Sequence, residues 1–323
     1  MTQIRRARGA PKPEGAAALI VAAQRVGFGI GSRIAPGIAR RWAMHLFCTP
    51  PRHPHPPVEK EWLQRSRRFE ITARGSRVAA WEWGGSGGKS GGKSGGSGEK
   101  TGEETRVESG GERAGDDKKY VLLVHGWGGR GSQLWAFVQP LLDAGYAVVT
   151  FDAPAHGFSG SRYASVLHFA QAMQAVVDAV GGVHGIVAHS LGGAAANLAL
   201  ARGWIEAARV VTIAAPTEFD SFSRRFARQL NVSDKVRDAM QHHLERRFGY
   251  RWQDFEGGRL ASANAMPALI IHDRGDKEVS FSDAEHLAAH WPGAHLLPTD
   301  KLGHRRILRD AFVVARSVEF MES

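Results

Sequence analysis

The sequence is poor in the features that mark secreted or membrane-spanning proteins. Cys48 is its single cysteine, so no internal disulfide can form and nothing points to an oxidising compartment. No apolar run is long enough to span a bilayer. The run from Ala16 to Ala23 is short, is followed by Gln24 and Arg25, and lacks a clear cleavage site, so it does not predict a signal peptide. These absences favour a cytoplasmic protein.

Acidic residues are scarce in one part of the chain, and this accounts for the net charge of +10. Residues 1–83 contain 15 Lys and Arg against 5 Asp and Glu, whereas residues 120–323 contain 20 of each. A balanced body with a basic arm favours a globular enzyme with an electrostatic attachment over a nucleic-acid-binding protein. We therefore expect no nucleic-acid partner.

The basic N-terminal part predicts a helical arm over residues 1–60. Residues 16–49 predict one or two helices, in which Ile34, Ile38, Trp42 and Leu46 recur at a spacing of four. This stripe suits either a helix packed on the body or a helix lying on a membrane surface. Glycines and Pro36 interrupt the stretch and favour packing. The Pro-rich run 49–57 predicts a stiff connector.

A Gly-rich segment, residues 84–119, has almost no apolar side chains and predicts a disordered insert. Within it, the run from Gly87 to Ser94 (GGKSGGKS) matches the phosphate-binding P-loop pattern. A phosphate cradle needs a helix that begins directly after the Lys-Ser pair, and here Gly-Gly-Ser-Gly follows. We therefore expect no nucleotide binding.

The rest of the chain, residues 61–323, alternates short apolar runs with helical patterns, which predicts a mostly parallel sheet flanked by helices. A hairpin is expected over 68–83, followed by strands over 120–125, 147–152, 185–188, 209–213, 268–272 and 294–297. Helices are expected over 133–144, 165–180, 191–202, 282–290 and 306–320. Between them, residues 217–266 predict a helical insert that is rich in arginine and aromatic residues.

The strongest chemical signal is the run from Gly185 to Gly193 (GIVAHSLGG). A short strand ends at Ser190 and passes directly into a helix. A serine on such a sharp strand-to-helix turn can act as a nucleophile, and its neighbours two residues away must be small. Ala188 and Gly192 meet this condition. The alternative is a serine that merely caps a helix.

Two further motifs precede this one in the sequence. The run from Val121 to Gly129 (VLLVHGWGG) is a buried strand that ends in a His-Gly turn, and the run from Asp152 to Ser159 (DAPAHGFS) follows the next strand. Together, and in this order, the three motifs resemble the α/β-hydrolase family over about residues 68–83 and 120–323. The resemblance implies an oxyanion hole formed by the backbone N–H groups of Trp127 and Leu191, and a structural role for the Asp152 segment.

The family order of nucleophile, acid and histidine implies the other two catalytic residues. Asp276 matches the position of the acid, and Asp273 is the alternative. His304, which lies between the last expected strand and the C-terminal helix, matches the histidine. The resemblance thus implies a Ser190–Asp276–His304 triad in which the acid orients the imidazole ring.

These motifs predict a serine hydrolase that cleaves a carboxylic ester, or else a thioester or amide, through an acyl-enzyme. The fold hosts many chemistries, so the substrate class rests partly on analogy. The insert at 217–266 occupies the usual cap position, where its aromatic residues either wall an acyl pocket or pack the cap. Two other hypotheses are a catalytically silent binding protein with the same scaffold and a membrane-associated lipid-ester hydrolase. No His, Cys and acid cluster has metal-ligand spacing, and we expect neither a metal nor a cofactor.

Overall fold

The computed structural model of the chain describes residues 13–85 and 119–323. The expected disordered insert and the P-loop-like run within it lie outside this part, apart from the flanking residues 84, 85 and 119. Among the described residues, no helix is long and apolar enough to cross a membrane.

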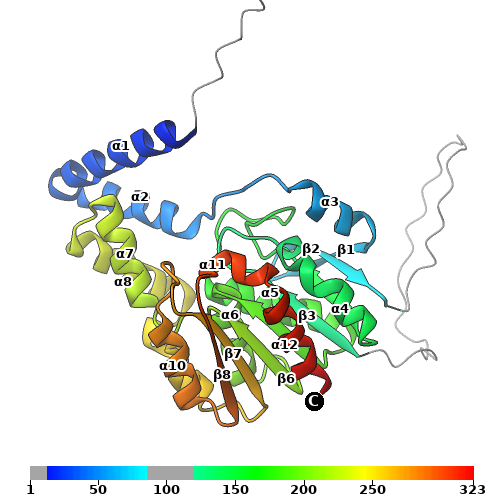
Figure 1. Cartoon of the computed structure of the whole chain (residues 1–323). Helices are drawn as coiled ribbons and strands as arrows, with labels where there is room; N and C mark the ends of the chain where they lie inside the picture. The colour runs from blue at the N-terminus through cyan, green and yellow to red at the C-terminus, as the bar shows by residue number, and fades with distance from the viewer. Residues whose placement is uncertain (1–12, 86–118) are drawn as a thin grey trace, which may run out of the picture.

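A single eight-stranded sheet organises the molecule (Figure 1). Its strands are β1 (Arg67–Ala73), β2 (Ser76–Trp83), β3 (Tyr120–Val124), β4 (Ala147–Phe151), β5 (Gly185–His189), β6 (Arg209–Ile213), β7 (Ala268–Asp273) and β8 (Ala294–Thr299). Their spatial order is β1-β2-β4-β3-β5-β6-β7-β8. The hairpin β1–β2 and the pair β2–β4 are antiparallel, and every other pair is parallel.

The central strands are buried on both faces, which explains why their sequences are continuous apolar runs. In β3, Leu122 and Val124 point into one core, while Val121 and Leu123 point into the other. The first core is completed by α5 (Val166–Val180), α6 (Leu191–Ala201), α9 (Gly257–Ala261) and α10 (Phe281–His290). The second is completed by η1 (Gly131–Phe137), α4 (Val138–Asp143) and α12 (Ala311–Glu322). The expected fold class is therefore confirmed.

Two helical features differ from the expectation. The Pro-rich connector leads into a helix that was not predicted, α3 (Pro57–Gln64). A proline is readily accommodated in the first turn of a helix, where its missing N–H has no partner to lose. The expected C-terminal helix over 306–320 is interrupted. The short helices α11 (Gly303–Arg306) and η3 (Ile307–Arg309) come first, and Asp310 then caps α12 by accepting a hydrogen bond from the Val313 amide.

A second helical layer lies beside the sheet. The cap helices α7 (Phe219–Leu230) and α8 (Asp234–Phe248), followed by η2 (Trp252–Phe255), lie against α1 (Pro13–Ile34) and α2 (Pro36–Cys48), as Figure 1 shows. These helices share a third apolar cluster, in which Phe28 is buried and stacks on Trp42. The N-terminal helices therefore pack on the cap, as the interrupted stretch had favoured.

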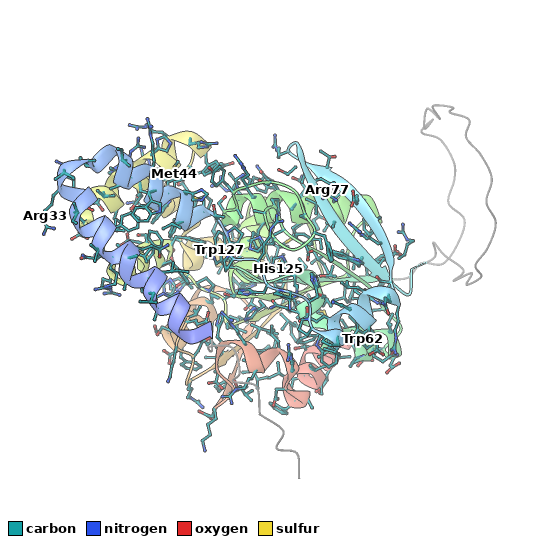
Figure 2. All side chains as sticks on the ribbon, turned by 90° about the horizontal axis from the view of Figure 1, so that it is seen from above. Arg33, Met44, Trp62, Arg77, His125 and Trp127 are labelled. Carbon is teal, nitrogen blue, oxygen red and sulfur yellow. The ribbon has the colours of Figure 1, made fainter. Side chains whose placement is uncertain are left out.

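The expected stripe is nevertheless not one packed face. Pro36 separates α1 from α2, and Ile34 and Ile38 are exposed while Trp42 packs inward. Seen from above, Arg33 lies at the outer edge of the molecule, Met44 lies closer to the body, and Trp127 and His125 lie near the centre (Figure 2).

Candidate active site

Ser190 occupies the sharp turn between β5 and α6. Its backbone has φ 51° and ψ −124°, a left-handed φ that is uncommon for a residue other than glycine. Neighbouring glycines make room for this turn. A Cβ on Gly192 would lie 2.5 Å from the His125 carbonyl oxygen, and a Cβ on Gly126 would lie 2.8 Å from the Ser190 Cβ. The turn therefore presents the Ser190 hydroxyl at the carboxyl edge of the sheet.

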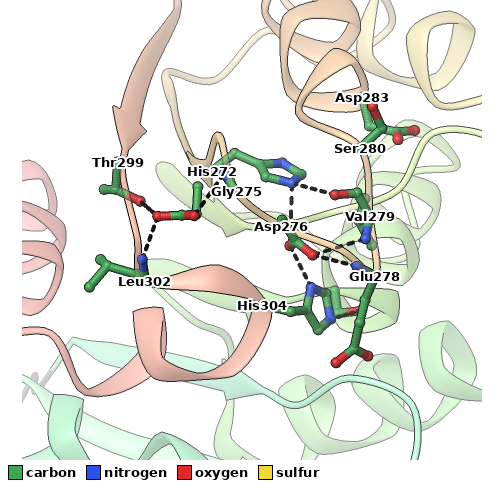
Figure 3. A network of polar contacts seen from close by, with 12 residues as sticks. His272, Gly275, Asp276, Glu278, Val279, Ser280, Asp283, Thr299, Leu302 and His304 are labelled. Carbon is green, nitrogen blue, oxygen red and sulfur yellow. Dashed lines mark hydrogen bonds and ion pairs between the residues drawn. The ribbon is translucent and has the colours of Figure 1, made fainter.

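Three predicted side chains meet at this edge. His304 Nε2 lies 3.0 Å from Ser190 Oγ. On the other side of the ring, His304 Nδ1 lies 2.7 Å from Asp276 Oδ2, as Figure 3 shows. Asp276 comes from the turn after β7, and His304 is the second residue of α11, which follows β8. The structure thus brings Ser190, Asp276 and His304 into one hydrogen-bonded line, although they are up to 114 residues apart in the chain.

Asp276 is held by more than His304. Its Oδ1 accepts hydrogen bonds from the backbone amides of Glu278 at 2.7 Å and Val279 at 3.1 Å. His272 Nε2 lies 3.5 Å from its Oδ2 (Figure 3). Burial alone would raise the pKa of Asp276, but the contacts with His272 and His304 and the Val279 amide hold that pKa well below its usual range. The carboxyl group is therefore ionised and fixed in orientation.

The alternative acid, Asp273, is buried in a different set of contacts. It accepts hydrogen bonds from the Gly275 amide at 2.9 Å, the Leu302 amide at 2.8 Å and the Thr299 hydroxyl at 3.0 Å. It thereby ties the end of β7 to the loop that carries His304. The structure places Asp273 as a brace and makes Asp276 the neighbour of His304.

The two residues expected to form the oxyanion hole line the same cavity as Ser190. Among the described residues, neither the Trp127 amide nor the Leu191 amide donates a hydrogen bond to another protein group. The loop of Trp127 is held by His156, whose Nε2 accepts a hydrogen bond of 3.0 Å from the Gly128 amide. The Leu191 amide is free because α6 begins at this residue and the first amides of a helix lack partners within it.

Buried histidines support this loop in their neutral form. Burial lowers the pKa of His156 to about 4 and places the pKa of His125 well below its ordinary value. His125 Nε2 accepts a hydrogen bond from the Ala153 amide at 2.9 Å. Protonation of either acceptor nitrogen would remove the hydrogen bond that it accepts.

Asp152 braces the segment below the site, as the resemblance implied. Its carboxylate accepts hydrogen bonds from the Gly131 amide at 2.8 Å and the Phe158 amide at 2.7 Å. Burial raises the pKa of Asp152 to about 6, although both amides oppose this shift. Asp152 is thus a structural residue that joins two loops.

A large cavity opens onto Ser190 and has a volume of about 680 Å³. Its walls include seven aromatic residues of the insert: Phe219, Phe222, Phe226, Phe248, Tyr250, Trp252 and Phe255. Arginines also line it, namely Arg225, Arg305, Arg306 and Arg309. The cavity therefore combines an aromatic wall with cationic side chains next to the serine.

Several residues at the site were not predicted from the sequence. His189 is buried, and its Nε2 lies 2.9 Å from the His304 carbonyl oxygen, where it can fix the backbone of that residue. Its place directly before Ser190 was the available signal. His272 shows only a four-residue spacing from Asp276. Leu46 and Phe47, at the end of α2, also line the cavity, which no sequence pattern indicated.

The described residues contain no group of three or more His, Cys, Asp or Glu side chains that could hold a metal ion. The histidines near Ser190 instead bond to backbone groups, to Asp276 or to the serine itself.

The sheet order and a comparison with protein-family models point to the same fold. A family model described as the alpha/beta hydrolase fold matches residues 119–246, from β3 to α8. The chain therefore has the α/β-hydrolase fold. No curated protein sequence matches it significantly.

Solved structures with the same fold include two esterases and a phospholipase. An esterase from Pyrococcus furiosus has a TM-score of 0.58 and 18% identity, over 85% of this chain and 98% of that one. A bacterial membrane phospholipase A, described as a virulence factor, has a TM-score of 0.57 and 14% identity, over 96% and 97%. An esterase from Rhodococcus has a TM-score of 0.52 and 17% identity, over 80% and 99%. At these identities the likeness establishes the fold.

Proposed function

We propose that this protein is a serine hydrolase that cleaves a carboxylic ester with Ser190 as nucleophile, His304 as general base and Asp276 as the orienting acid. The observation that carries the proposal is the pair of short contacts, Ser190 Oγ to His304 Nε2 at 3.0 Å and His304 Nδ1 to Asp276 Oδ2 at 2.7 Å. A nucleophile, a base and a third group that orients the base form the arrangement that activates a hydroxyl.

The reaction follows from these positions. Asp276 accepts the Nδ1–H of His304, which leaves Nε2 free to take the proton of Ser190 as Oγ attacks the ester carbonyl. The Trp127 and Leu191 amides stabilise the negative oxygen of the tetrahedral intermediate. The protonated His304 then donates to the leaving alcohol, and water hydrolyses the acyl-enzyme by the reverse proton path.

The cavity supports an apolar acyl group as the substrate's reacting half. Nine Phe, Tyr and Trp side chains line about 680 Å³ of space beside Ser190. An acyl chain that binds against them removes apolar surface from water, which favours binding. The solved structures of the same fold include proteins described as esterases and a phospholipase. We propose a carboxylic ester on this basis, with a thioester or an amide as the other acyl substrates of the same mechanism.

The test is hydrolysis of p-nitrophenyl esters of graded acyl length by the wild type and by Ser190→Ala. We expect kcat/KM to rise from acetyl to longer acyl groups, and Ser190→Ala to lose at least about three orders of magnitude in kcat. Ser165→Ala is the matched control, because Ser165 also lines the cavity but caps α5 and contacts His168 instead of His304. Its lost cap costs about 1 kcal/mol of stability and little turnover.

Two results separate the parts of this proposal. A Ser190→Ala enzyme that keeps most of its turnover would contradict the nucleophile. Wild-type protein that is folded but hydrolyses none of the esters would favour the alternative, a silent binding protein. A preference for acetyl esters would contradict only the apolar acyl group.

A further inference from the structure

The outer face of α1 and the start of α2 expose an unusual amount of apolar surface. Leu19, Ile34 and Ile38 are 72%, 78% and 69% exposed. They belong to a larger set of exposed aliphatic side chains on these two helices: Leu19, Ile20, Val21, Val26, Ile30, Ile34 and Ile38. We call this set the outer apolar face.

Helical spacing shows that most of this set forms a continuous surface. Leu19, Val26, Ile30 and Ile34 follow one another at intervals of seven, four and four residues, which places them along one side of α1. Phe28 lies on the opposite side, where it is fully buried and stacks on Trp42 at 4.1 Å between ring centroids. The helix thus has two apolar sides, of which the body covers one.

Specific contacts hold α1 in this position. Arg25 Nη1 donates hydrogen bonds to the carbonyl oxygens of Arg228 at 3.1 Å and Gln229 at 2.7 Å. The Asn231 side-chain amide donates in return to the Arg25 carbonyl oxygen at 3.3 Å. These bonds join α1 to the end of α7. They fix the orientation of α1 and thereby keep the outer apolar face turned away from the body.

The charges around this face have one sign. From Ala18 to Thr49 the chain contains four arginines, Arg25, Arg33, Arg40 and Arg41, and no Asp or Glu. Arg33 and Arg41 are exposed, and Arg33 lies at the outer edge of the molecule (Figure 2). Aliphatic side chains with a cationic border are complementary to a surface that is apolar below and anionic above, which describes a bilayer of anionic lipids.

We propose that the outer apolar face docks on the surface of an anionic lipid bilayer, with the aliphatic side chains at the acyl boundary and the arginines among the headgroups. No described helix can cross a membrane, so docking means lying on the surface. A second copy of the chain fits less well, because two such faces would bring like charges together. The proposal does not depend on the proposed hydrolase activity.

Docking would place the cavity close to the lipid. The end of α2 contributes Leu46, Phe47 and Cys48 to the lining of the cavity that holds Ser190. Ile38, which lies in the first turn of the same helix, belongs to the outer apolar face. A single helix therefore runs from the proposed docking surface to the cavity.

The test is co-sedimentation of purified full-length protein with vesicles of phosphatidylcholine alone or of phosphatidylcholine mixed with phosphatidylglycerol. We expect binding to the mixed vesicles that weakens as salt rises, and at least about tenfold weaker binding for Ile30→Glu/Ile34→Glu. Phe312→Glu is the matched control, because Phe312 is an exposed aromatic residue of α12 outside this face, and we expect it to bind as the wild type does. Circular dichroism checks that each variant is folded.

Several results would overturn the proposal: no binding to mixed vesicles, equal binding to both vesicle types, or an Ile30→Glu/Ile34→Glu variant that binds as tightly as the wild type. A dimer in sedimentation velocity that this variant alone dissociates, without vesicle binding, would assign the face to self-association instead. Ser190→Ala should bind vesicles normally, so a failure of the hydrolase proposal remains distinguishable.

Discussion

At the scale of single residues, two neighbouring acids have different surroundings. Asp276 contacts His304, whereas Asp273 accepts three hydrogen bonds that tie β7 to the His304 loop. Both carboxyl groups are buried and lie three residues apart, so their hydrogen-bond partners separate their roles.

We predict that Asp276→Asn lowers kcat by about three to four orders of magnitude, because an amide can favour the wrong tautomer of His304. Asp273→Asn should keep most of the turnover and lower the unfolding free energy by about 1–3 kcal/mol through its disrupted hydrogen bonds. Ester hydrolysis and chemical denaturation of both variants make the comparison. The reverse order of kcat losses would assign the orienting role to Asp273.

The neutral histidines give stability a pH dependence. His156 has a pKa of about 4 in the folded protein against its usual 6.5, so between these pH values the folded state holds fewer protons than the unfolded state. The unfolding free energy must therefore fall as pH falls through this window.

We expect His156 to account for about 2 kcal/mol of the fall between pH 7 and pH 5. His156→Gln should reduce this pH dependence, and His295→Gln, at an exposed histidine of β8, should leave it unchanged. Urea denaturation at both pH values measures the difference. An unchanged pH dependence in His156→Gln would mean that this ring is not held neutral.

At the scale of elements, helices α1 and α2 bind the cap through their inner side. Phe28 is the largest contribution from α1, since it is fully buried against Trp42. We predict that Phe28→Ala lowers the unfolding free energy by about 3 kcal/mol through the cavity that it leaves. Phe312→Ala removes the same ring from an exposed position and should cost less than about 0.5 kcal/mol. Equal losses in thermal or chemical denaturation would contradict the packing of α1.

The elements that the sequence predicted best are those whose local pattern is decisive. In β3, for example, the residues from Val121 to Val124 are all buried, and the sequence there is a continuous apolar run that ends at a His-Gly turn. Helix α3 was missed because its first residue follows a run of prolines that also suits an extended connector. The break at Asp310 was missed because the apolar spacing continues across it.

The site could be predicted only where local sequence fixes the backbone. Ser190 was found because the tight turn demands small neighbours, and His304 and Asp276 came from a resemblance in the order of motifs. The role of His272 depends on the path of the turn after β7, which folds Asp276 back toward it. The part of α2 in the cavity wall depends on tertiary packing, which no local pattern encodes.

At the scale of the whole molecule, the connection between β2 and β3 is longer than its geometry requires. Trp83 at the end of β2 and Tyr120 at the start of β3 pair with Val148 and Ala147 of β4, so both ends lie at the same edge of the sheet. Two strand spacings, about 10 Å, separate them, and an eight-residue loop spans that gap.

Replacing residues 86–118 with eight Gly and Ser residues should therefore leave kcat/KM within about twofold, because closing a loop depends weakly on its length. The full-length protein should also bind no ATP despite its GGKSGGKS run. Ester hydrolysis and calorimetric titration with ATP check both statements. Saturable ATP binding that Lys93→Ala abolishes would overturn the second.

The central claim is that Ser190 is the activated nucleophile, and the most direct measurement is covalent labelling with a fluorophosphonate. Intact-mass spectrometry of the wild type should show a single adduct, which peptide mapping places on Ser190, while Ser190→Ala should remain unlabelled. Asp276→Asn should react at least about a hundredfold more slowly, because His304 then lacks its orienting partner. Folded wild-type protein that stays unlabelled, or an adduct that maps to another serine and persists in Ser190→Ala, would contradict the claim.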